Sequence, residues 1–481
     1  MTRVRWSVRG CFLVALLMLL GLAQAESQGQ TARLHARRIA VFGSSVANGI
    51  GDEYNREGYT GLLRALLAPR GWEVLNQSRG GDTPPRLARR WAPEGTADPA
   101  VRYLLPVRPS YVVIGLSYGN EGLYEAESKT EEDAVYQQYL DGIRGLVDRA
   151  RRDGIVPVVS LAYPRSVYTP TDYEYVRRAN LVQHQWDVPS VNTLGPLDDG
   201  SGRWAQGFFY DDKHPNSAGH KEVFYAYVPT LFDALEANKP TPVRPAEGSG
   251  FARVSGGVSP LTFSPRETMH AFALSVAVRT QGDGTVAAVH GSKLEAASER
   301  KSVQNGASTL QVESTTLTQG VAVTATVGVT GGKWAYTGST GATISSAVAA
   351  DAQWHRIALS HYTARGETLF FVDGRLAGTV IERLEPTRVV VGGAGAADLP
   401  GAPPQADYRD VFVFRAALNA DEVGALHRGK VLQGSLEIYA PLADATLTAG
   451  ATVENRAQSM SAFEVGAASI VHVEKKEGNT E

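Results

Sequence analysis

The sequence has 481 residues, a length at which one hydrophobic core normally divides into two or more domains. Its 43% hydrophobic and 20% charged residues are ordinary for a globular protein, and its 50 glycines indicate many turns and substantial β structure. The formal net charge is only −3 and no basic block stands in the chain, which argues against nucleic acid and anionic membrane surfaces as partners.

Residues 1–25 are predicted to be a secretory signal peptide. Three arginines precede an apolar run that is short for a membrane span, and Ala23-Gln24-Ala25 forms a small-x-small cleavage motif. We therefore expect cleavage after Ala25 and a secreted or periplasmic protein, with an uncleaved anchor as the alternative. The only cysteine, Cys11, lies in this segment, so the mature chain would have no disulfide and no thiolate chemistry. No later stretch is long and apolar enough to span a bilayer.

Residues 36–236 alternate strand-like and helix-like segments. Short apolar runs are followed by stretches whose apolar residues recur at helical spacing. Such alternation predicts a mostly parallel sheet with helices on both faces, a three-layer α/β domain of flavodoxin-like type. We predict strands at 37–43, 72–78, 110–119 and 155–164, and helices at 59–71, 133–154 and 214–237.

Four polar, glycine-containing segments stand where the predicted strands end. FGSSV follows the first strand, NQSRGGDT the second and YGNEG the third, and YDDKHPNSAGH precedes the final helix. Sites of open α/β sheets lie at the carboxyl ends of the strands, so we expect these segments at one edge. A serine nucleophile needs an imidazole base, an orienting carboxylate and oxyanion donors, and the segments contain all three. Taken alone, Ser44 or Ser45 would be only a helix cap.

The order of these segments resembles that of the SGNH (GDSL-type) hydrolase family. FGSSV matches the family's strand followed by Gly-Asp-Ser and puts Ser45 at the nucleophile position. NQSRGGDT matches the block with the oxyanion glycine, here Gly81, and YGNEG matches the Gly-x-Asn-Asp block, here with Asn120. YDDKHPNSAGH carries the Asp-x-x-His pair as Asp211 and His214.

This resemblance implies a serine hydrolase mechanism. Ser45 would attack an ester carbonyl, His214 would accept its proton and later give it to the leaving alcohol, and Asp211 would hold the other imidazole nitrogen. The backbone N–H groups of Ser45 and Gly81, with the side-chain amide of Asn120, would form the oxyanion hole.

The sequence departs from the family pattern at two positions. Ser44 stands where the family has Asp before the nucleophile, and Glu121 stands where it has Asp after Asn120. Neither position is a triad member, so the implied mechanism survives. The departures nevertheless motivate an alternative in which the hydrolase domain is inactive.

Other candidates for the same chemistry are weaker. Asp212 competes for the orienting role, but its spacing to His214 does not fit Asp-x-x-His. His184 and His220 are interpreted as structural or exposed. No set of histidines and carboxylates has metal-ligand spacing, and the glycines after Ser45 lack the lysine of a phosphate loop, so no cofactor is expected.

The residue pattern changes after a Pro- and Gly-rich linker at 237–250. From 251 to 473, short strand-like runs recur between glycine-rich turns, among them two separate runs at 309–317 and 321–329, and LNADEVGALHRG is the single helical signal. This pattern predicts an all-β sandwich of jelly-roll type, followed by a frayed tail at 474–481.

The β domain also carries a resemblance. ADAQWHRIALSHY, TLFFVDGRLAGTV and DYRDVFVFRAALNADEVGAL are similar to the laminin-G-like, concanavalin-A-like jelly roll that is attached to many secreted enzymes. In this fold Trp354 and Phe412 would be core residues, so we nominate no glycan-binding residue. A structural calcium would fit the resemblance, although no acidic cluster marks a site.

Together these features predict an exported serine esterase that cleaves carboxylic esters. A carbohydrate-type β domain beside it favours deacetylation of an acylated carbohydrate, and the lack of a long apolar lid favours a small acyl group. The alternatives are a lipolytic acylhydrolase (lysophospholipase, thioesterase or arylesterase), or a glycan-binding protein with an inactive hydrolase domain.

Overall fold

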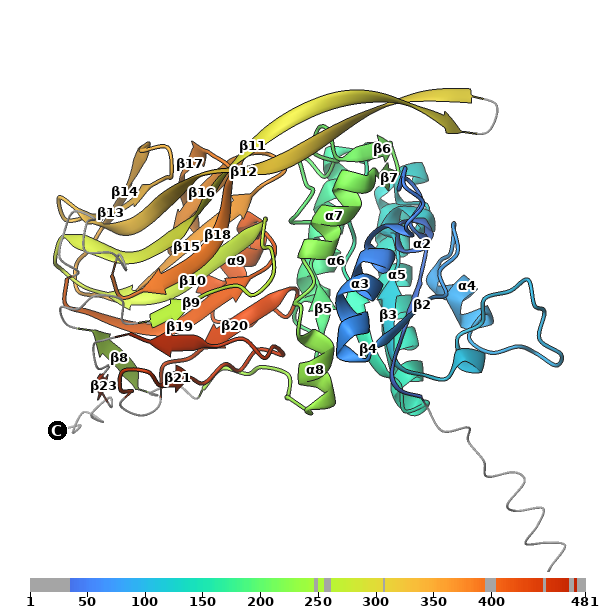
Figure 1. Cartoon of the computed structure of the whole chain (residues 1–481), viewed down its shortest axis with the longest axis horizontal. Helices are drawn as coiled ribbons and strands as arrows, with labels where there is room; N and C mark the ends of the chain where they lie inside the picture. The colour runs from blue at the N-terminus through green and yellow to red at the C-terminus, as the bar shows by residue number, and fades with distance from the viewer. Residues whose placement is uncertain are drawn as a thin grey trace, which may run out of the picture.

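The computed structural model describes residues 35–245, 250–254, 261–305, 308–393, 404–443, 447–466 and 471–473. The predicted signal peptide (1–25), the predicted tail (474–481) and residues 246–249 of the predicted linker lie outside these ranges. An N-terminal α/β region and a C-terminal β region lie side by side (Figure 1). In the described part of the chain, no helix is both long and apolar enough to cross a membrane.

The α/β region is built on a five-stranded sheet in the order β2-β1-β3-β4-β5, and every pair is parallel. Its strands are β1 (His35–Gly43), β2 (Glu73–Asn76), β3 (Pro109–Gly115), β4 (Val156–Ser160) and β5 (Ser190–Val191). The central strands are buried on both faces, as a doubly covered sheet requires. The predicted parallel sheet is therefore confirmed.

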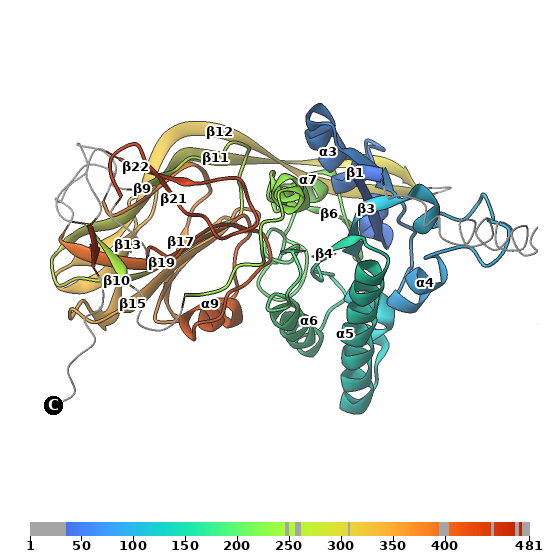
Figure 2. The same ribbon diagram turned by 90° about the horizontal axis from the view of Figure 1, so that it is seen from below.

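Helices cover both faces of this sheet (Figure 2). One apolar cluster joins the sheet to α3 (Gly58–Leu67), α7 (Ser217–Tyr225) and α8 (Leu231–Glu236). The other joins it to α4 (Pro84–Arg89), α5 (Lys129–Arg152) and α6 (Pro170–Gln183). The polar segments that follow the strands are thereby left at the open carboxyl edge.

Helix α6 is not predicted from the sequence. Its start is fixed by a capping box, in which Thr169 Oγ1 accepts from Asp172 N at 3.1 Å and the Asp172 carboxylate accepts from Thr169 N at 2.8 Å. The helix contacts both α5 and α9 (Ala420–His427), and its buried residues include Asn180 and Gln183. Because polar residues occupy buried positions of α6, its sequence lacks the apolar stripe that marks an amphipathic helix.

The single helix predicted over 214–237 is wrong. His214 and Pro215 form a short strand, β7 (His214–Pro215), and two helices, α7 and α8, follow it. Pro229 lies between these helices, and its missing N–H explains why one continuous helix does not form.

The β region consists of two antiparallel sheets around one apolar core, which is consistent with a β sandwich. One sheet has the order β17-β16-β15-β10-β19-β8-β23, with β20 beside β19, and the other has the order β14-β13-β12-β11-β18-β9-β22-β21. The strands are β8 (Phe251–Val254), β9 (Leu261–Phe263), β10 (Phe272–Arg279), β11 (Gly284–Asn305), β12 (Ser308–Thr330), β13 (Lys333–Thr337), β14 (Thr343–Ala349), β15 (His355–Tyr362), β16 (Glu367–Val372), β17 (Arg375–Ile381), β18 (Leu384–Val391), β19 (Ala406–Phe414), β20 (Leu436–Ala440), β21 (Thr452–Val453), β22 (Phe463–Val465) and β23 (Val471–Val473).

The two aromatic residues expected in the β core differ. Phe412 is fully buried and stacks on Tyr439 with ring centroids 4.4 Å apart. Trp354 is only partly buried and lies against the guanidinium of Arg409, at 4.3 Å from its ring centroid. The prediction for Trp354 is therefore wrong, because a neighbouring cation covers its ring instead of the apolar core.

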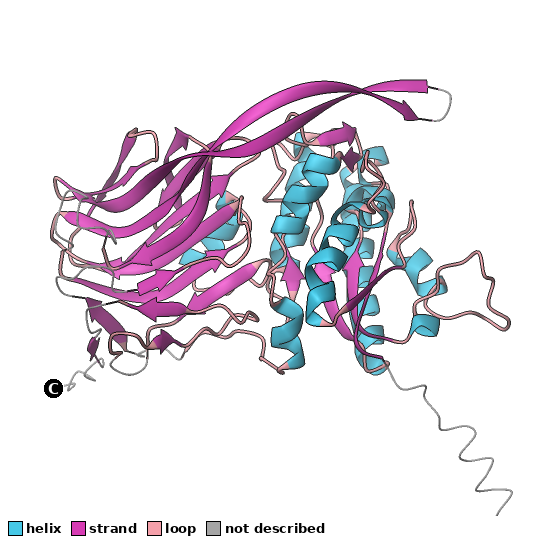
Figure 3. Ribbon diagram, viewed as in Figure 1, coloured by secondary structure: helices cyan, strands magenta, loops and turns pink. Residues whose placement is uncertain are grey.

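Strands β11 and β12 form a long ribbon that leaves the β region and passes over the α/β region (Figure 3). The two strands pair with each other along their whole length, from Gly284 opposite Val329 to Asn305 opposite Ser308. Two separate strands predicted at 309–317 and 321–329 are in fact one continuous strand of 23 residues, β12.

The two regions also share a buried polar interface. His184 Nδ1 accepts from Gly434 N at 3.0 Å, so Nε2 carries the proton and donates to Glu422 Oε1 at 2.9 Å. Asn192 N donates to Ser435 Oγ at 2.9 Å. His184 is therefore structural, as the sequence indicates, and both hydrogen-bond partners of its ring belong to the β region.

Candidate active site

Ser45 begins the short helix α2 (Ser45–Asn48) directly after β1. The turn depends on Gly43, because a Cβ there would lie 2.0 Å from the carbonyl oxygen of Gly115 on β3. Ser44 N donates to this same carbonyl at 2.9 Å. The chain thus turns at the carboxyl edge of the sheet and holds Ser45 there with 5% exposure.

Ser44 is the less accessible of the two serines. It is completely buried, and its hydroxyl lies 3.4 Å from the hydroxyl of Tyr163. Tyr163 follows β4 and stacks on Trp204 with ring centroids 5.7 Å apart. Ser44 therefore joins the end of β1 to the segment after β4.

Asp211 and His214 face each other across a tight hairpin formed by β6 (Phe209–Asp211) and β7. His214 Nδ1 lies 2.8 Å and 2.9 Å from the two carboxylate oxygens of Asp211. With the ring proton on Nδ1, Nε2 is left as a free base. The carboxylate of Asp211 also accepts from Lys213 N at 2.8 Å. Asp212 takes no part in this pair.

The pKa of Asp211 lies below its usual value. Burial raises this pKa, but the hydrogen bond and charge of His214 outweigh it, and the backbone N–H groups of Lys213 and His214 act in the same direction. The carboxylate therefore stays charged, which is the state needed to orient an imidazole.

The segment after α2 lies against the strand that carries His214. A Cβ at Gly51 would lie 2.1 Å from the carbonyl oxygen of Pro215, and His220 Nε2 donates to the carbonyl of Ile50 at 3.0 Å. Helix α2 itself packs on β7. A cleft of about 590 Å³ lies at this junction, and its walls include Asn48, Ile50, Tyr210, Asp211 and His214.

Ser45 and His214 are brought to neighbouring elements but not into hydrogen-bond contact. Within the described residues, no hydrogen bond joins them. Catalytic hydrogen bonds in uncomplexed hydrolases are often long and tighten when substrate binds.

The glycine pair of NQSRGGDT lies beside Ser45. A Cβ at Gly80 would be 3.8 Å from the Cβ of Ser45. Gly81 has φ +77°, a conformation that favours glycine, and its carbonyl accepts from Arg86 Nη1 at 2.6 Å. Asp82 follows and forms a buried ion pair with Arg90.

Asn120 lies in the 3₁₀ turn Tyr118–Glu121, which follows β3. Both the nitrogen and the oxygen of its side-chain amide form hydrogen bonds. Its Nδ2 donates to the carbonyl of Asp82 at 3.1 Å, and its Oδ1 accepts from Arg165 Nη2 at 2.8 Å. The amide nitrogen is therefore fixed on the side of the Gly81–Asp82 segment, and one of its two hydrogens remains available to a ligand.

Glu121 contacts Gln138, whose Nε2 donates to Glu121 Oε2 at 3.3 Å. Burial raises the pKa of Glu121 to about 7, and Gln138 and Arg86 offset the rise only in part. At neutral pH this side chain is thus partly protonated, unlike an exposed carboxylate.

Asp52 holds the loop between α2 and α3. Its carboxylate accepts from the backbone N–H groups of Arg56 at 2.7 Å and Gly58 at 3.1 Å, and from Ser217 Oγ at 2.7 Å. Burial raises the pKa of Asp52, but these donors outweigh it and lower the value overall. Because Ser217 begins α7, Asp52 fixes this loop to the helix that follows His214.

His220 is structural, in agreement with the sequence interpretation. Burial lowers its pKa to about 4, so the ring is neutral. Its Nδ1 accepts from Tyr59 N at 3.4 Å. Among the described residues, no group of three or more His, Cys, Asp or Glu side chains could hold a metal ion.

Three residues at this edge are missed by the sequence interpretation. Tyr163 and Arg165 follow β4. Their position at the carboxyl end of a strand is the signal that would have found them. Asp52 stands among the glycines of NGIGDEYN, where nothing in the sequence distinguishes it from an ordinary turn residue.

Residues 41–222 match the model of the GDSL-like Lipase/Acylhydrolase family. No curated protein matches the chain. Three similar solved structures are TesA (25% identity, 40% of this chain, 97% of that chain, TM-score 0.31), a catalytic mutant of an acetylxylan esterase from Geobacillus stearothermophilus (16%, 40%, 92%, 0.30), and a native heptameric SAP-like pentraxin from Limulus polyphemus (12%, 48%, 98%, 0.31).

The family match covers every segment at the carboxyl edge, from FGSSV to YDDKHPNSAGH. It indicates an ester hydrolase, in agreement with the sequence prediction. Residues 41–222 of this chain are therefore similar to the GDSL-like lipase and acylhydrolase family.

Proposed function

We propose that this protein is a serine esterase that uses Ser45, His214 and Asp211. The observation that carries the proposal is the His214–Asp211 pair, whose imidazole lines the same cleft as the end of the helix that Ser45 begins. The oxyanion hole would consist of the backbone N–H groups of Ser45 and Gly81 and the side-chain amide of Asn120.

The mechanism has two steps in which the imidazole acts first as base and then as acid. Ser45 Oγ bonds to the ester carbon as its proton moves to His214 Nε2, and the carbonyl oxygen becomes an oxyanion. The C–O bond to the alcohol then breaks, and the alcohol leaves with the proton from Nε2. A water molecule repeats the sequence on the acyl-serine, which releases the carboxylic acid and restores Ser45.

The substrate we propose is a carbohydrate that carries a small acyl group, such as acetate. The walls of the cleft include the polar side chains of Asn48, Glu53, Asn55 and Tyr210. A long acyl chain would strip water from these groups without replacing their hydrogen bonds, which costs free energy. Polar walls instead suit the hydroxyl groups of a sugar.

A panel of aryl esters from acetate to palmitate tests this function. We expect kcat/KM to be highest for acetate and Ser45→Ala to reduce it by a factor on the order of 10⁴ or more. A preference for palmitate would instead support a lipolytic enzyme. If no ester is turned over in a Ser45-dependent manner, the protein is not an esterase and glycan binding becomes the leading hypothesis.

Ser44→Ala is the matched control for the choice of nucleophile. Ser44 is completely buried against Tyr163, so its hydroxyl has no access to substrate. We expect Ser44→Ala to retain a measurable rate. Activity that survives Ser45→Ala but not Ser44→Ala would mean that the other serine attacks.

We further propose that the enzyme acts outside the cytoplasm. The support is the sequence of residues 1–25. Expression of the full chain in a bacterial host, followed by fractionation and mass spectrometry, is expected to give exported protein that begins at Glu26. Protein that retains residues 1–25 in the membrane fraction would contradict the proposal.

A further inference from the structure

The ribbon of β11 and β12 extends far beyond the sheet that it belongs to. Strand β11 pairs with β18 only up to Lys293, and β12 pairs with β13 only from Thr326. We call the part of the ribbon from the pair Leu294–Gln319 outward, residues 294–305 and 308–319, the arm. A two-stranded ribbon is marginally stable in water, so contacts with the α/β region must hold it in place.

The arm is attached to the segments on both sides of the β6–β7 hairpin. Thr315 N donates to the carbonyl of Gly207 at 2.9 Å, just before β6. Asn216 Nδ2, two residues after His214, donates to the carbonyl of Glu313 at 3.0 Å. Asn216 is completely buried and caps α7 through Gly219 N. The arm thus binds the backbone that carries His214.

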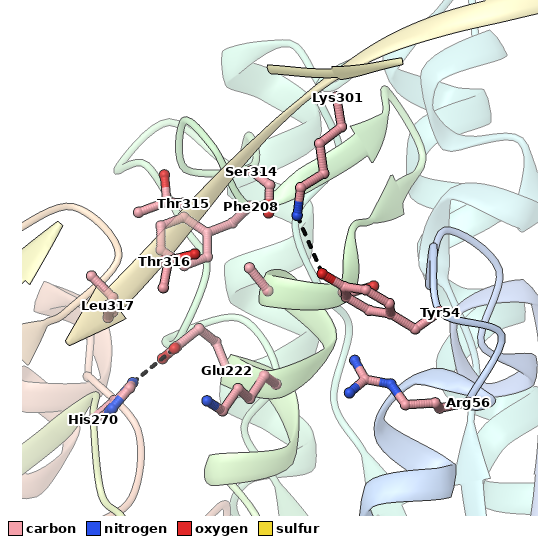
Figure 4. Close-up of a pocket in the computed structure, with 13 residues that line it drawn as sticks. Tyr54, Arg56, Phe208, Glu222, His270, Lys301, Ser314, Thr315, Thr316 and Leu317 are labelled. Atoms are coloured by element: carbon pink, nitrogen blue, oxygen red, sulfur yellow. Dashed lines mark hydrogen bonds and ion pairs between the residues drawn. The ribbon is translucent and has the colours of Figure 1, made fainter. Parts of the chain in front are cut away.

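Further along, the arm contributes to the walls of two neighbouring cavities. Val303 lines the cleft of about 590 Å³ together with His214. Lys301 and Thr316 line a second cavity, of about 200 Å³, together with Tyr54 (Figure 4). Both cavities therefore lie between the arm and the α/β region.

Tyr54 lies between these cavities. Its neighbours Glu53 and Asn55 line the cleft that contains His214, and Tyr54 lines the second cavity. Tyr54 is 59% exposed, and its hydroxyl accepts from Lys301 Nζ at 3.2 Å (Figure 4). The guanidinium of Arg56 lies over this ring, 4.6 Å from its centroid. The part of the ring that remains exposed is a contact surface for a ligand.

The chemistry of the walls favours one occupant. The second cavity is lined by the polar side chains of Ser314, Thr316 and Lys221 and by the apolar side chains of Phe208 and Leu317, beside the tyrosine ring. A polyhydroxylated chain can place the C–H face of a sugar on the ring and its hydroxyls on these polar groups. An acyl chain would leave the same groups desolvated and unpaired.

We propose that the arm forms the outer wall of the substrate cleft and that a glycan chain binds under it, with one sugar on Tyr54 and the ester of a neighbouring sugar at Ser45. This inference rests on the proposed esterase function. It assigns the recognition of the alcohol part of the substrate to both regions of the chain, because Val303 and Lys301 belong to the β region.

An O-acetylated cello-oligosaccharide series, from mono- to hexasaccharide, tests the inference on the full-length protein. We expect kcat/KM of the wild type to rise with chain length. Tyr54→Ala is expected to lower the ratio of kcat/KM for the hexasaccharide to kcat/KM for aryl acetate about tenfold. Tyr54→Phe keeps the ring and is expected to retain at least half of the ratio.

Two further variants test the arm itself. Val303→Trp narrows the cleft and is expected to reduce turnover of the hexasaccharide more than that of the monosaccharide. Val321→Ala is the matched control, because Val321 is an exposed residue of the same ribbon that lines neither cavity. It is expected to leave both activities unchanged.

The outcomes separate this inference from the proposed function. If aryl acetate is cleaved in a Ser45-dependent manner but neither Tyr54→Ala nor Val303→Trp changes the dependence on glycan length, the arm inference is overturned and the esterase stands. An equal loss in Tyr54→Phe and Tyr54→Ala would overturn the role of the ring. If no ester is cleaved at all, the esterase itself fails.

Discussion

Arg165 donates from Nη2 to the side-chain oxygen of Asn120 at 2.8 Å, and this bond decides which way the amide points. Without such a bond, the side-chain amide of an asparagine can rotate by about 180°, which exchanges the positions of its oxygen and nitrogen. Arg165 is buried, with 1% exposure, in the segment that follows β4. The oxyanion role proposed for Asn120 therefore depends on a second residue that touches no substrate atom.

Replacement of Arg165 by Met is expected to lower kcat by a factor on the order of 10 to 100, with little change in KM, because a misoriented amide stabilises the transition state less. Asn120→Ala is expected to lower kcat by a factor on the order of 100 or more. Steady-state kinetics on aryl acetate measures both.

The double variant that combines Arg165→Met with Asn120→Ala shows whether Arg165 acts through Asn120. We expect it to be no slower than Asn120→Ala alone, because the arginine then has no amide left to orient. Independent, multiplicative losses would refute a positioning role. Thermal denaturation of each variant separates this effect from a loss of folded protein.

Asp52→Asn is expected to destabilise the fold by about 2–3 kcal/mol at pH 7, because the backbone N–H groups of Arg56 and Gly58 and the hydroxyl of Ser217 lose their carboxylate. The pKa of Asp52 is lowered in the folded protein. Its stabilising contribution is therefore present above the ordinary aspartate pKa and is lost as the pH falls through the folded value.

Urea denaturation between pH 3 and pH 8 measures this effect. The difference in unfolding free energy between wild type and Asp52→Asn is expected to shrink as the medium becomes acidic. Asp141→Asn, an exposed carboxylate on α5, is expected to stay within about 0.5 kcal/mol of wild type. A constant difference at every pH would contradict the assignment.

Glu121 is expected to make the fold less stable as the pH rises. Burial raises its folded pKa to about 7, whereas the unfolded chain releases this proton near 4.5. The free energy of unfolding therefore falls as the pH rises from 4.5 to about 7, and it is constant at higher pH. Glu121→Gln cannot ionise, so it is expected to exceed wild type in unfolding free energy above pH 7 and to match it near pH 4.

Thermal melts across this pH range test the prediction, with Glu125→Gln as the control. Glu125 is an exposed neighbour. A variant Glu121→Gln that gains nothing at pH 8 would show that the carboxyl group is solvated in solution.

Glu422→Ala is expected to cost about 3 kcal/mol of unfolding free energy. The carboxylate is 1% exposed and accepts from His184 and from its own helix cap, Asn419 N, at 2.7 Å. The adjacent Asp421→Ala removes a solvent-exposed ion pair with Arg177 and is expected to cost less than about 1 kcal/mol. Urea denaturation of both variants is the measurement, and equal losses would contradict a buried interface.

The parallel sheet and the candidate edge could be predicted because both rest on local signals. Apolar runs give the strands, and the polar residues after each strand give Ser45, Gly81 and Asn120. The second half of the site could not be predicted in this way. Asp52 and Arg165 act through hydrogen bonds to distant segments, and such bonds leave no periodicity in the sequence.

The ribbon and the interface between the regions were unpredictable for a related reason. Alternating patterns locate strands but do not say where a strand continues past its sheet, so residues 309–317 and 321–329 read as two elements. The buried side chains of His184 and Glu422 stand 238 positions apart in the chain. Each looks like an ordinary surface residue in its own segment.

The attachment of the arm also orders events when the chain folds. Asn216 stands beside His214, yet the carbonyl that its side chain binds, that of Glu313, is synthesised 97 residues later. Contacts of such sequence separation form late, because a long loop must close before they are gained. A newly made chain therefore completes its α/β sheet before its histidine hairpin gains the contacts with Glu313 and Thr315.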